Sequence, residues 1–213
     1  MPIDLILICH GQAVQRDGER LYGWWADMPL SHWGKQQSLL IGERIKNDFD
    51  INAIYTSPLT RAQQTARLIG DIVQVVPAVE HALRELESGD LSTLSYEEAQ
   101  HRYPNVILDG QSLEEAHIPG SETYAAMHNR VASAIGQIIN QSPDQQIACI
   151  THGGPIVAYL RAAMGYAPEQ QRKPRFLCRA ASIHHLQMDH EGERTVVALN
   201  DIAHLTGLPD HEQ

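Results

Sequence analysis

Apolar runs alternate with longer amphipathic segments along this chain. Residues 3–9 and 147–151 are near-continuous apolar runs, of the kind that is buried on both faces of a parallel sheet. Residues 53–58 form a shorter run, and residues 182–189 and 194–201 have the pattern of a final pair of strands. Because strand-type runs alternate with helical ones, the pattern predicts an α/β fold with a mostly parallel sheet.

Two long segments have the 3.6-residue period of an amphipathic helix: residues 31–47 and residues 123–140. Between them, residues 77–120 show irregular polarity with short helical candidates. No internal repeat, low-complexity tract or linker divides the sequence. We therefore predict a single domain spanning residues 1–213, in which residues 77–120 form a cap or excursion.

Two further helices are predicted to begin directly after strands. Ser57 has the character of an N-cap, and Pro58 that of a first helical residue. Arg61 then lies within the first turn, on the side opposite the apolar stripe of this helix. The other helix is predicted to start at Pro155 and to end near Gly165.

Two of the predicted strands end in the same way, on a histidine followed by a glycine. His10 and Gly11 follow the first run, and His152 and Gly153 follow residues 147–151, directly before a helix. Ligands in open α/β sheets bind outside the carboxyl ends of the strands. Unpaired N–H groups at a helix N-terminus favour an anion there. The sequence therefore predicts an anion site between these two strand ends.

Two histidines and Arg61 around one anion are suited to phosphoryl transfer. A histidine nitrogen can attack phosphorus and form a phosphohistidine, and a nearby carboxylic acid can protonate the leaving oxygen. Glu85 and Glu87, in the irregular segment, are the candidate acids. Taken singly, His10 is more often a packed strand-end histidine, and Arg61 and Glu85 are more often surface residues. Their joint placement at strand ends favours the catalytic interpretation.

Composition narrows the class of protein. A formal net charge of −10 argues against nucleic acid or an anionic membrane as the main partner. The apolar runs are far shorter than the roughly 20 residues of a membrane helix, and residues 1–11 lack the features of a secretory signal. The three cysteines share no CxxC spacing and have the pattern of reduced thiols, so we expect a cytoplasmic protein.

No metal or other cofactor is predicted. The sequence contains no HExxH motif, CxxC motif or acidic cluster. His184 and His185 are adjacent on a predicted strand, so their side chains point to opposite faces and do not chelate one metal together. The phosphohistidine chemistry outlined above needs no metal.

Several motifs together resemble the histidine phosphatase superfamily, in its phosphoglycerate mutase-like branch. The resemblance covers nearly the whole chain, and the second motif named below is highly specific. The matching stretches are LICHGQ (7–12), IYTSPLTRAQQTA (54–66), DMPLSHWGKQQ (27–37), LRELESGD (83–90), IPGSETYAAMHNRV (118–131) and ITHGGP (150–155).

The resemblance implies a three-layer sandwich around a doubly wound, mostly parallel sheet. It implies a phosphatase acting on a small phosphorylated substrate without an obligatory metal. His10 is then the nucleophile, Glu85 the acid/base, and Arg61 and His152 bind the phosphoryl group, with His152 also counted as catalytic. Neither nucleic acid nor a membrane is an expected partner, and a homo-oligomer is compatible with the sequence.

Cys9 departs from the family pattern, which has at this position an arginine that forks onto the phosphoryl oxygens. A thiol cannot supply a bidentate charged contact, and losing one such donor typically costs roughly 10²–10³ in rate. We predict that Arg16 partly replaces it, seven residues after Cys9. The backbone amides of Gly11 and Gly153 are also predicted to bind the phosphate.

Alternative functions follow from the same residues. A phosphoglycerate mutase-type phosphomutase is one, although the stretch from Glu85 to His152 is shorter than in the glycolytic mutases. A catalytically impaired relative that binds or senses a phosphate ligand is another, because of Cys9. A Cys-x5-Arg tyrosine phosphatase is disfavoured, because six residues with a single glycine separate Cys9 from Arg16.

Overall fold

The computed structural model of the chain describes residues 2–14, 27–107, 118–142, 145–170, 176–189 and 191–207. Within these residues, six strands form one sheet in the order β3-β2-β4-β1-β5-β6. The first four strands are parallel to one another, β5 is antiparallel to β1, and β6 is antiparallel to β5. The strands are β1 (Ile3–Cys9), β2 (Ala53–Thr56), β3 (Ala78–Val79), β4 (Gln146–Thr151), β5 (Ile183–Met188) and β6 (Arg194–Asp201).

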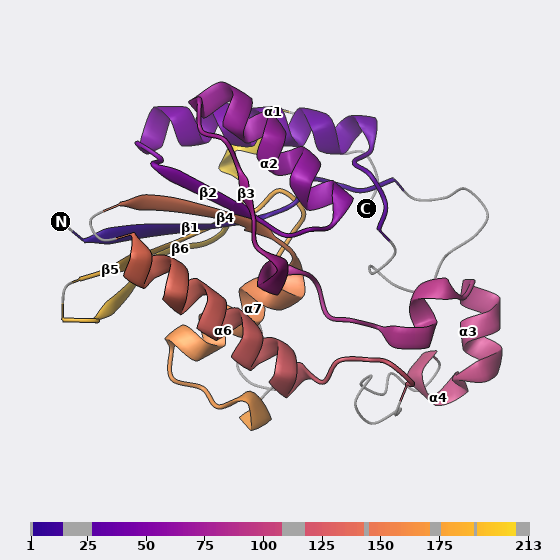
Figure 1. Cartoon of the computed structure of the whole chain (residues 1–213). Helices are drawn as coiled ribbons and strands as arrows, with labels where there is room; N and C mark the ends of the chain where they lie inside the picture. The colour runs from indigo at the N-terminus through magenta and orange to yellow at the C-terminus, as the bar shows by residue number, and fades with distance from the viewer. Residues whose placement is uncertain are drawn as a thin grey trace.

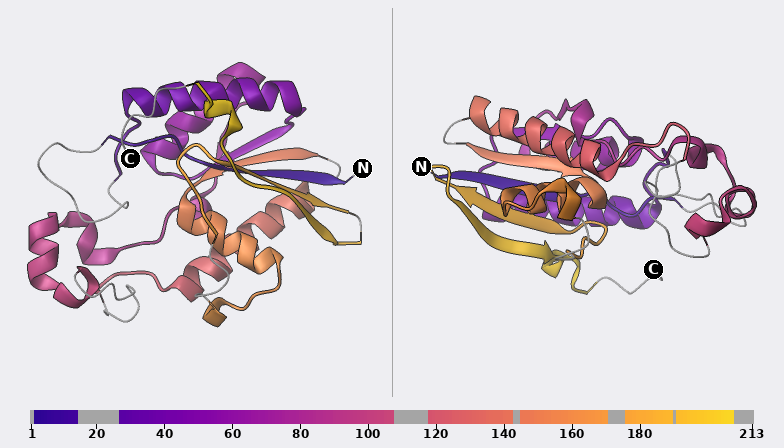
Figure 2. Two further views of the ribbon diagram at one scale, coloured as in Figure 1. Left: turned by 180° about the vertical axis from the view of Figure 1, so that it is seen from behind. Right: turned by 90° about the horizontal axis from the view of Figure 1, so that it is seen from below.

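Helices cover both faces of this sheet. Helices α1 (His32–Asp48) and α2 (Thr60–Val73) pack on one face, and α6 (Tyr124–Gln141) and α7 (Gly153–Ala163) pack on the other (Figures 1 and 2). The predicted three-layer, doubly wound sandwich is therefore confirmed. None of the helices in the described ranges is both long and apolar enough to cross a membrane.

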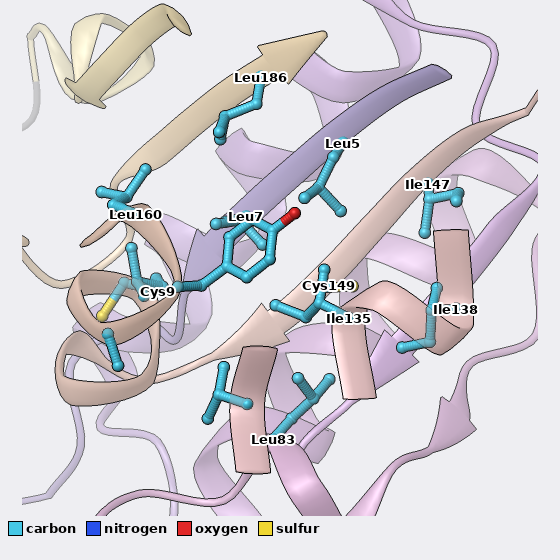
Figure 3. Close-up of a cluster of buried hydrophobic side chains, with 14 of the residues drawn as sticks. Leu5, Leu7, Cys9, Leu83, Ile135, Ile138, Ile147, Cys149, Leu160 and Leu186 are labelled. Carbon is cyan, nitrogen blue, oxygen red and sulfur yellow. The ribbon is translucent and has the colours of Figure 1, made fainter. Parts of the chain in front are cut away.

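The central strand β1 explains why both faces need a helical layer. Successive side chains of a strand point to opposite faces. Leu5, Leu7 and Cys9 accordingly belong to the buried cluster under α6 and α7 (Figure 3), whereas Ile6 and Ile8 belong to the cluster under α1 and α2. All five side chains are at most 5% exposed, as a near-continuous apolar run predicts.

The two long helices start where the sequence indicates. Ser31 is the N-cap of α1, and its hydroxyl accepts a hydrogen bond from the Gly34 N–H at 2.9 Å. Thr123 is the N-cap of α6, and its hydroxyl accepts one from the Ala126 N–H at 3.1 Å. Each hydroxyl satisfies a backbone donor that has no partner inside the helix.

The predicted start of α2 at Pro58 is wrong, because the helix begins at Thr60. Ser57 does not cap it. The carboxylate of Asp27 accepts instead from the Thr60 backbone N–H at 2.5 Å and from its hydroxyl at 2.8 Å. The Ser57 hydroxyl is engaged with His152 at 2.7 Å, so the cap comes from a residue distant in sequence.

The predicted start of α7 is also displaced, because the helix begins at Gly153, two residues before Pro155. His152 occupies the N-cap position with an extended backbone. This histidine therefore lies directly at the N-terminal end of the helix, closer to its first N–H groups than the sequence predicted.

The described part of residues 77–120 contains β3, two short 3₁₀ helices (His81–Leu83 and Gly89–Thr93), α3 (Tyr96–Arg102) and α4 (Pro104–Ile107). Helices α3 and α4 lie beyond the sheet, on the side where β1 and β4 end (Figure 1). The expected excursion is thus located at the carboxyl ends of the strands. Its function as a cap, and the single-domain organisation, stay predictions.

A close backbone crossing fixes the loop after β1 against the first turn of α1. A Cβ atom on Gly34 would overlap the carbonyl oxygen of Gln12, and one on Gly11 would overlap the carbonyl oxygen of Gly34. Backbone atoms cannot move aside as the end of a flexible side chain can. Glycine at these positions is therefore a packing requirement.

We expect Gly34→Ala to lower the free energy of unfolding by roughly 1–3 kcal/mol, because the added methyl group overpacks the crossing. Gly136→Ala is the matched control, since nothing lies within 4 Å of a Cβ at this position of α6. The control should gain about 0.5–1 kcal/mol from helix propensity. Urea denaturation followed by circular dichroism measures the free energy of unfolding of both variants. Equal stability of the two variants would contradict the packing requirement at Gly34.

Candidate active site

The pairing of β1 with β4 brings the two motif histidines together. Cys9 is directly opposite Thr151 in the parallel register, so His10 and His152 are the next residues on adjacent strands. The His10 N–H donates to the Thr151 carbonyl at 3.0 Å. The two imidazole centroids are 5.0 Å apart with an interplanar angle of 62°, close to the roughly 4.8 Å that separates neighbouring strands.

Hydrogen bonds define the protonation state of His10. Arg61 donates from Nε to His10 Nε2 at 2.9 Å, and His10 Nδ1 lies 2.6 Å from the Gly11 carbonyl oxygen. Arginine only donates and a carbonyl only accepts, so the proton is on Nδ1 and the lone pair is on Nε2. Burial lowers the pKa of His10 to about 3, and the charge of Arg61 acts in the same direction. His10 is therefore a neutral imidazole with an available lone pair at neutral pH.

Arg61 is the buried cation of the site. It is the second residue of α2 and is only 2% exposed, although arginine in a helix is usually solvated. Burial lowers its pKa, and the negative charges of Glu85 and Asp27 oppose this effect. An arginine remains protonated despite such a shift, so a fixed positive charge lies beside the His10 lone pair.

His152 is fully buried, and Ser57 orients it. His152 Nε2 is 2.7 Å from the Ser57 hydroxyl, which also accepts a hydrogen bond from the Leu59 N–H at 3.2 Å. Among the described residues, His152 Nδ1 has no hydrogen-bond partner. Burial lowers the pKa of His152 well below its ordinary value, and the charge of Arg61 acts in the same direction. A second neutral imidazole therefore faces the first.

Glu85 is held against the N-terminus of α7. Its carboxylate accepts hydrogen bonds from the Leu86 N–H at 2.9 Å and from the Gly154 N–H at 3.4 Å. A Cβ on Gly154 would overlap this carboxylate, so glycine is required for the approach. Burial raises the pKa of Glu85, while both backbone hydrogen bonds and Arg61 lower it. Burial is the largest effect, so Glu85 holds a proton more readily than an exposed glutamate.

Gly11, Gly153 and Arg16 are the other residues predicted to bind the phosphate. The Gly11 N–H donates to the Thr65 hydroxyl at 3.1 Å, and the Gly11 carbonyl orients His10, so both of its backbone groups are engaged. Gly153 is the first residue of α7, where backbone N–H groups have no partner within the helix. Arg16 lies outside the described residues. The phosphate contacts of all three stay predictions.

Cys9 is buried in the apolar layer under α6 and α7. It is 5% exposed and packs in the cluster under α6 and α7. Its thiol interacts with the thiol of Cys178, a residue that no sequence pattern connects with Cys9. A neutral sulfur at this position supplies no charge to a phosphoryl group.

Sequence reasoning missed two residues of this site. Ser57 was predicted as a helix cap, and its contact with His152 arises because β2 and β4 are neighbours in the sheet. Cys178 is brought in by the loop before β5. The position of Ser57 at the end of a strand could have identified it as a site residue. No pattern in the sequence pointed to Cys178.

Within the described ranges, no group of three or more histidine, cysteine, aspartate or glutamate side chains is placed to hold a metal ion. The side chains that the site brings together are a neutral imidazole with an available lone pair, a buried guanidinium, a second imidazole and a carboxyl group of raised pKa.

Comparisons with known proteins agree with this arrangement. The family model of the histidine phosphatase superfamily, branch 1, matches residues 5–202. The chain is 30% identical over 166 residues to the uncharacterized phosphatase PhoE of Bacillus subtilis (strain 168), covering 78% of this chain and 79% of that protein. It is 29% identical over 178 residues to the probable phosphoglycerate mutase GpmB of Yersinia enterocolitica, covering 81% and 80%.

A solved structure supports the fold. Bacillus stearothermophilus YhfR superposes with a TM-score of 0.81 at 22% sequence identity, covering 95% of this chain and 99% of that one. Since the family model covers almost the whole sequence, the chain belongs to the histidine phosphatase superfamily, in branch 1. Its relatives include proteins named as phosphatases and as phosphoglycerate mutases.

The hydrogen-bond geometry generates a prediction for the pH dependence of His10. A lowered pKa favours the neutral ring, so His10 should stay neutral, with its proton on Nδ1, from pH 7 down to about pH 4. Nitrogen-15 chemical shifts of the imidazole, assigned by their loss in His10→Ala, measure this directly. A His10 signal that titrates near the ordinary value of about 6.5 would contradict the geometry.

Proposed function

We propose that the protein is a phosphomonoester hydrolase that acts through a phosphohistidine on His10. The observation that carries this proposal is the neutral His10, whose Nε2 lone pair faces the Arg61 guanidinium at 2.9 Å with His152 at its side. A nucleophilic nitrogen next to a fixed positive charge is suited to attack on an anionic phosphate ester.

In the first step, His10 Nε2 attacks phosphorus and the bond from phosphorus to the leaving oxygen breaks. Glu85 gives its proton to that oxygen, which its raised pKa favours. Arg61 and the first N–H of α7, at Gly153, stabilise the negative charge on the transferring group. For this, the Arg61 hydrogen bond has to pass from the His10 lone pair to a phosphoryl oxygen.

In the second step, a water molecule attacks the phosphohistidine. Glu85, now a carboxylate, takes a proton from the water as the oxygen–phosphorus bond forms and the phosphorus–nitrogen bond breaks. Inorganic phosphate is released, and His10 returns to the neutral state. The hydrogen bond from Nδ1 to the Gly11 carbonyl keeps the ring oriented through both steps.

Cys9 makes this enzyme slower than a relative that has arginine at the same position, because one bidentate donor is missing. Arg16 is proposed to supply part of the lost charge. Residues 77–120 are proposed to cover the leaving-group side, since α3 and α4 lie beyond the carboxyl ends of β1 and β4. A small phosphorylated metabolite is the class of substrate that fits such a site.

A phosphomutase is the second candidate, because one of the relatives is named as a probable phosphoglycerate mutase. The two reactions share the first step and differ in whether water or a second substrate hydroxyl receives the phosphoryl group. Incubation with 3-phosphoglycerate distinguishes them: the phosphatase releases inorganic phosphate, whereas the mutase forms 2-phosphoglycerate.

Loss of the nucleophile tests the proposal directly. We expect His10→Ala to lower the turnover of p-nitrophenyl phosphate by about 10³-fold or more, because no other group forms the covalent intermediate. The matched control is His81→Ala, which removes an exposed histidine in the turn before Glu85 and should leave turnover unchanged.

The intermediate itself provides a second measurement. Rapid mixing with substrate, followed by an alkaline quench and mass spectrometry, should show a phosphoryl group on the peptide that contains His10. Equal turnover by the parent protein and His10→Ala would contradict catalysis by His10 and favour a phosphate-ligand binding or regulatory function.

Replacing the proposed acid tests Glu85. We expect Glu85→Gln to lower kcat by about 10²–10⁴-fold for an alkyl phosphate, whose leaving oxygen needs a proton. The loss should be smaller for p-nitrophenyl phosphate, whose leaving group departs as a stable anion. Glu87→Gln, at the exposed alternative candidate, is the matched control. An equal loss for both substrates would show that Glu85 is not the proton donor.

A further inference from the structure

Two cysteines from distant parts of the chain meet beside the histidine pair. Cys9 is the last residue of β1 and is buried, and Cys178 is partly buried in the loop before β5. Their thiols interact with each other, and both are free. The proposed hydrolysis uses neither of them.

Backbone hydrogen bonds hold the Cys178 loop against the end of β1. The Cys9 N–H donates to the Ser182 carbonyl at 3.0 Å, and the Ala181 N–H donates to the His10 carbonyl at 2.9 Å. Cys178 also packs against the apolar cluster that contains Cys9. The main chain therefore holds the loop that carries Cys178 beside the end of β1.

The surroundings of Cys178 favour a thiolate. The pKa of Cys178 is lowered, first by its interaction with Cys9 and then by His184 and Ser182, although burial opposes this, while the pKa of Cys9 is raised. A Cβ on Gly153 would lie 3.9 Å from the Cys178 sulfur, so this sulfur adjoins the N-terminus of α7. The positive end of a helix dipole stabilises a thiolate. The pair therefore favours the thiolate at Cys178 and the neutral thiol at Cys9.

We propose that Cys9 and Cys178 are an oxidisable thiol pair, a modification site in the wall of the phosphate pocket that hydrogen peroxide converts into an intramolecular disulfide. The Cys178 thiolate attacks one peroxide oxygen and the O–O bond breaks. The released hydroxide takes up a proton and leaves as water, and Cys178 becomes a sulfenic acid.

The second step closes the crosslink. Cys9 loses its proton, its sulfur attacks the Cys178 sulfur, and the S–O bond breaks as a second water leaves. The two thiols are oxidised to one disulfide, and one peroxide is reduced to two waters. The disulfide forms whether or not the site turns over substrate, and only its effect on phosphate chemistry rests on the proposed function.

Cys149 offers an internal comparison. It is the third cysteine of the chain, fully buried on β4, and burial raises its pKa to about 12. Such a thiol is inert towards peroxide because the thiolate is the reactive form. The proposal therefore concerns two specific cysteines of the three.

Thiol counting and peptide mapping test the proposal without any measurement of activity. The reduced protein is treated with hydrogen peroxide, the excess is removed with catalase, and free thiols are counted after unfolding. We expect the parent protein to lose two of its three thiols, to yield a linked peptide containing Cys9 and Cys178, and to recover with dithiothreitol. Cys149→Ser, the matched control, should form the same crosslink.

Two single substitutions show which cysteine reacts in each of the two oxidation steps. Cys178→Ser should form no crosslink and should slow thiol oxidation by more than about tenfold, because the reactive thiolate is gone. Cys9→Ser should stop at the sulfenic acid of Cys178, trapped with dimedone. Three remaining thiols, a linkage through Cys149, a disulfide between two chains, or oxidation of Cys178→Ser as fast as the parent would each overturn the proposal.

Discussion

The parallel pairing of β1 with β4 is the constraint on which the site depends. Because Cys9 is opposite Thr151, the next residues on the two strands, His10 and His152, are forced side by side. The hydrogen bond from the His10 N–H to the Thr151 carbonyl continues the ladder past the end of the strand. A register shift of one residue would turn the side chains of a whole strand to the opposite face, so the burial of both faces of β1 protects the geometry of the site.

Burial and fixed charge then decide the chemistry of these side chains. His10 and His152 are neutral because both are desolvated and both face Arg61. Desolvation acts in the opposite direction on Glu85 and favours its protonated form. Burial at the carboxyl end of the sheet thus favours a deprotonated imidazole and a protonated carboxyl group, which is the division of roles that phosphoryl transfer with a protonated leaving group requires.

The cysteine at position 9 changes the chemistry at the carboxyl end of β1. Where the family resemblance predicts a guanidinium, this chain has a sulfur that packs among apolar side chains and interacts with Cys178. The proposed phosphate site therefore lacks one ligand, and the proposed oxidisable thiol pair takes its place. The two differences have one origin, since both follow from a small side chain at the last position of β1.

Sequence alone determined the strands and helices with the strongest periodicity, and the residues that follow them. The runs of apolar residues defined β1 and β4, and the His-Gly pairs after them marked the site, because burial on both faces leaves a signature that needs no knowledge of the partner strand. The shared motifs extended this to Arg61 and Glu85. Each of these residues is close in sequence to the strand or helix that positions it.

Tertiary structure alone decided which side chains form hydrogen bonds or contacts with each other. Ser57 orients His152 instead of capping α2, and Asp27 caps that helix from another part of the chain. The burial of Arg61 and the meeting of Cys9 with Cys178 likewise depend on strand order and loop packing. Such contacts join residues that are distant in sequence, and a hydrogen-bonding side chain has no periodicity from which its partner can be inferred.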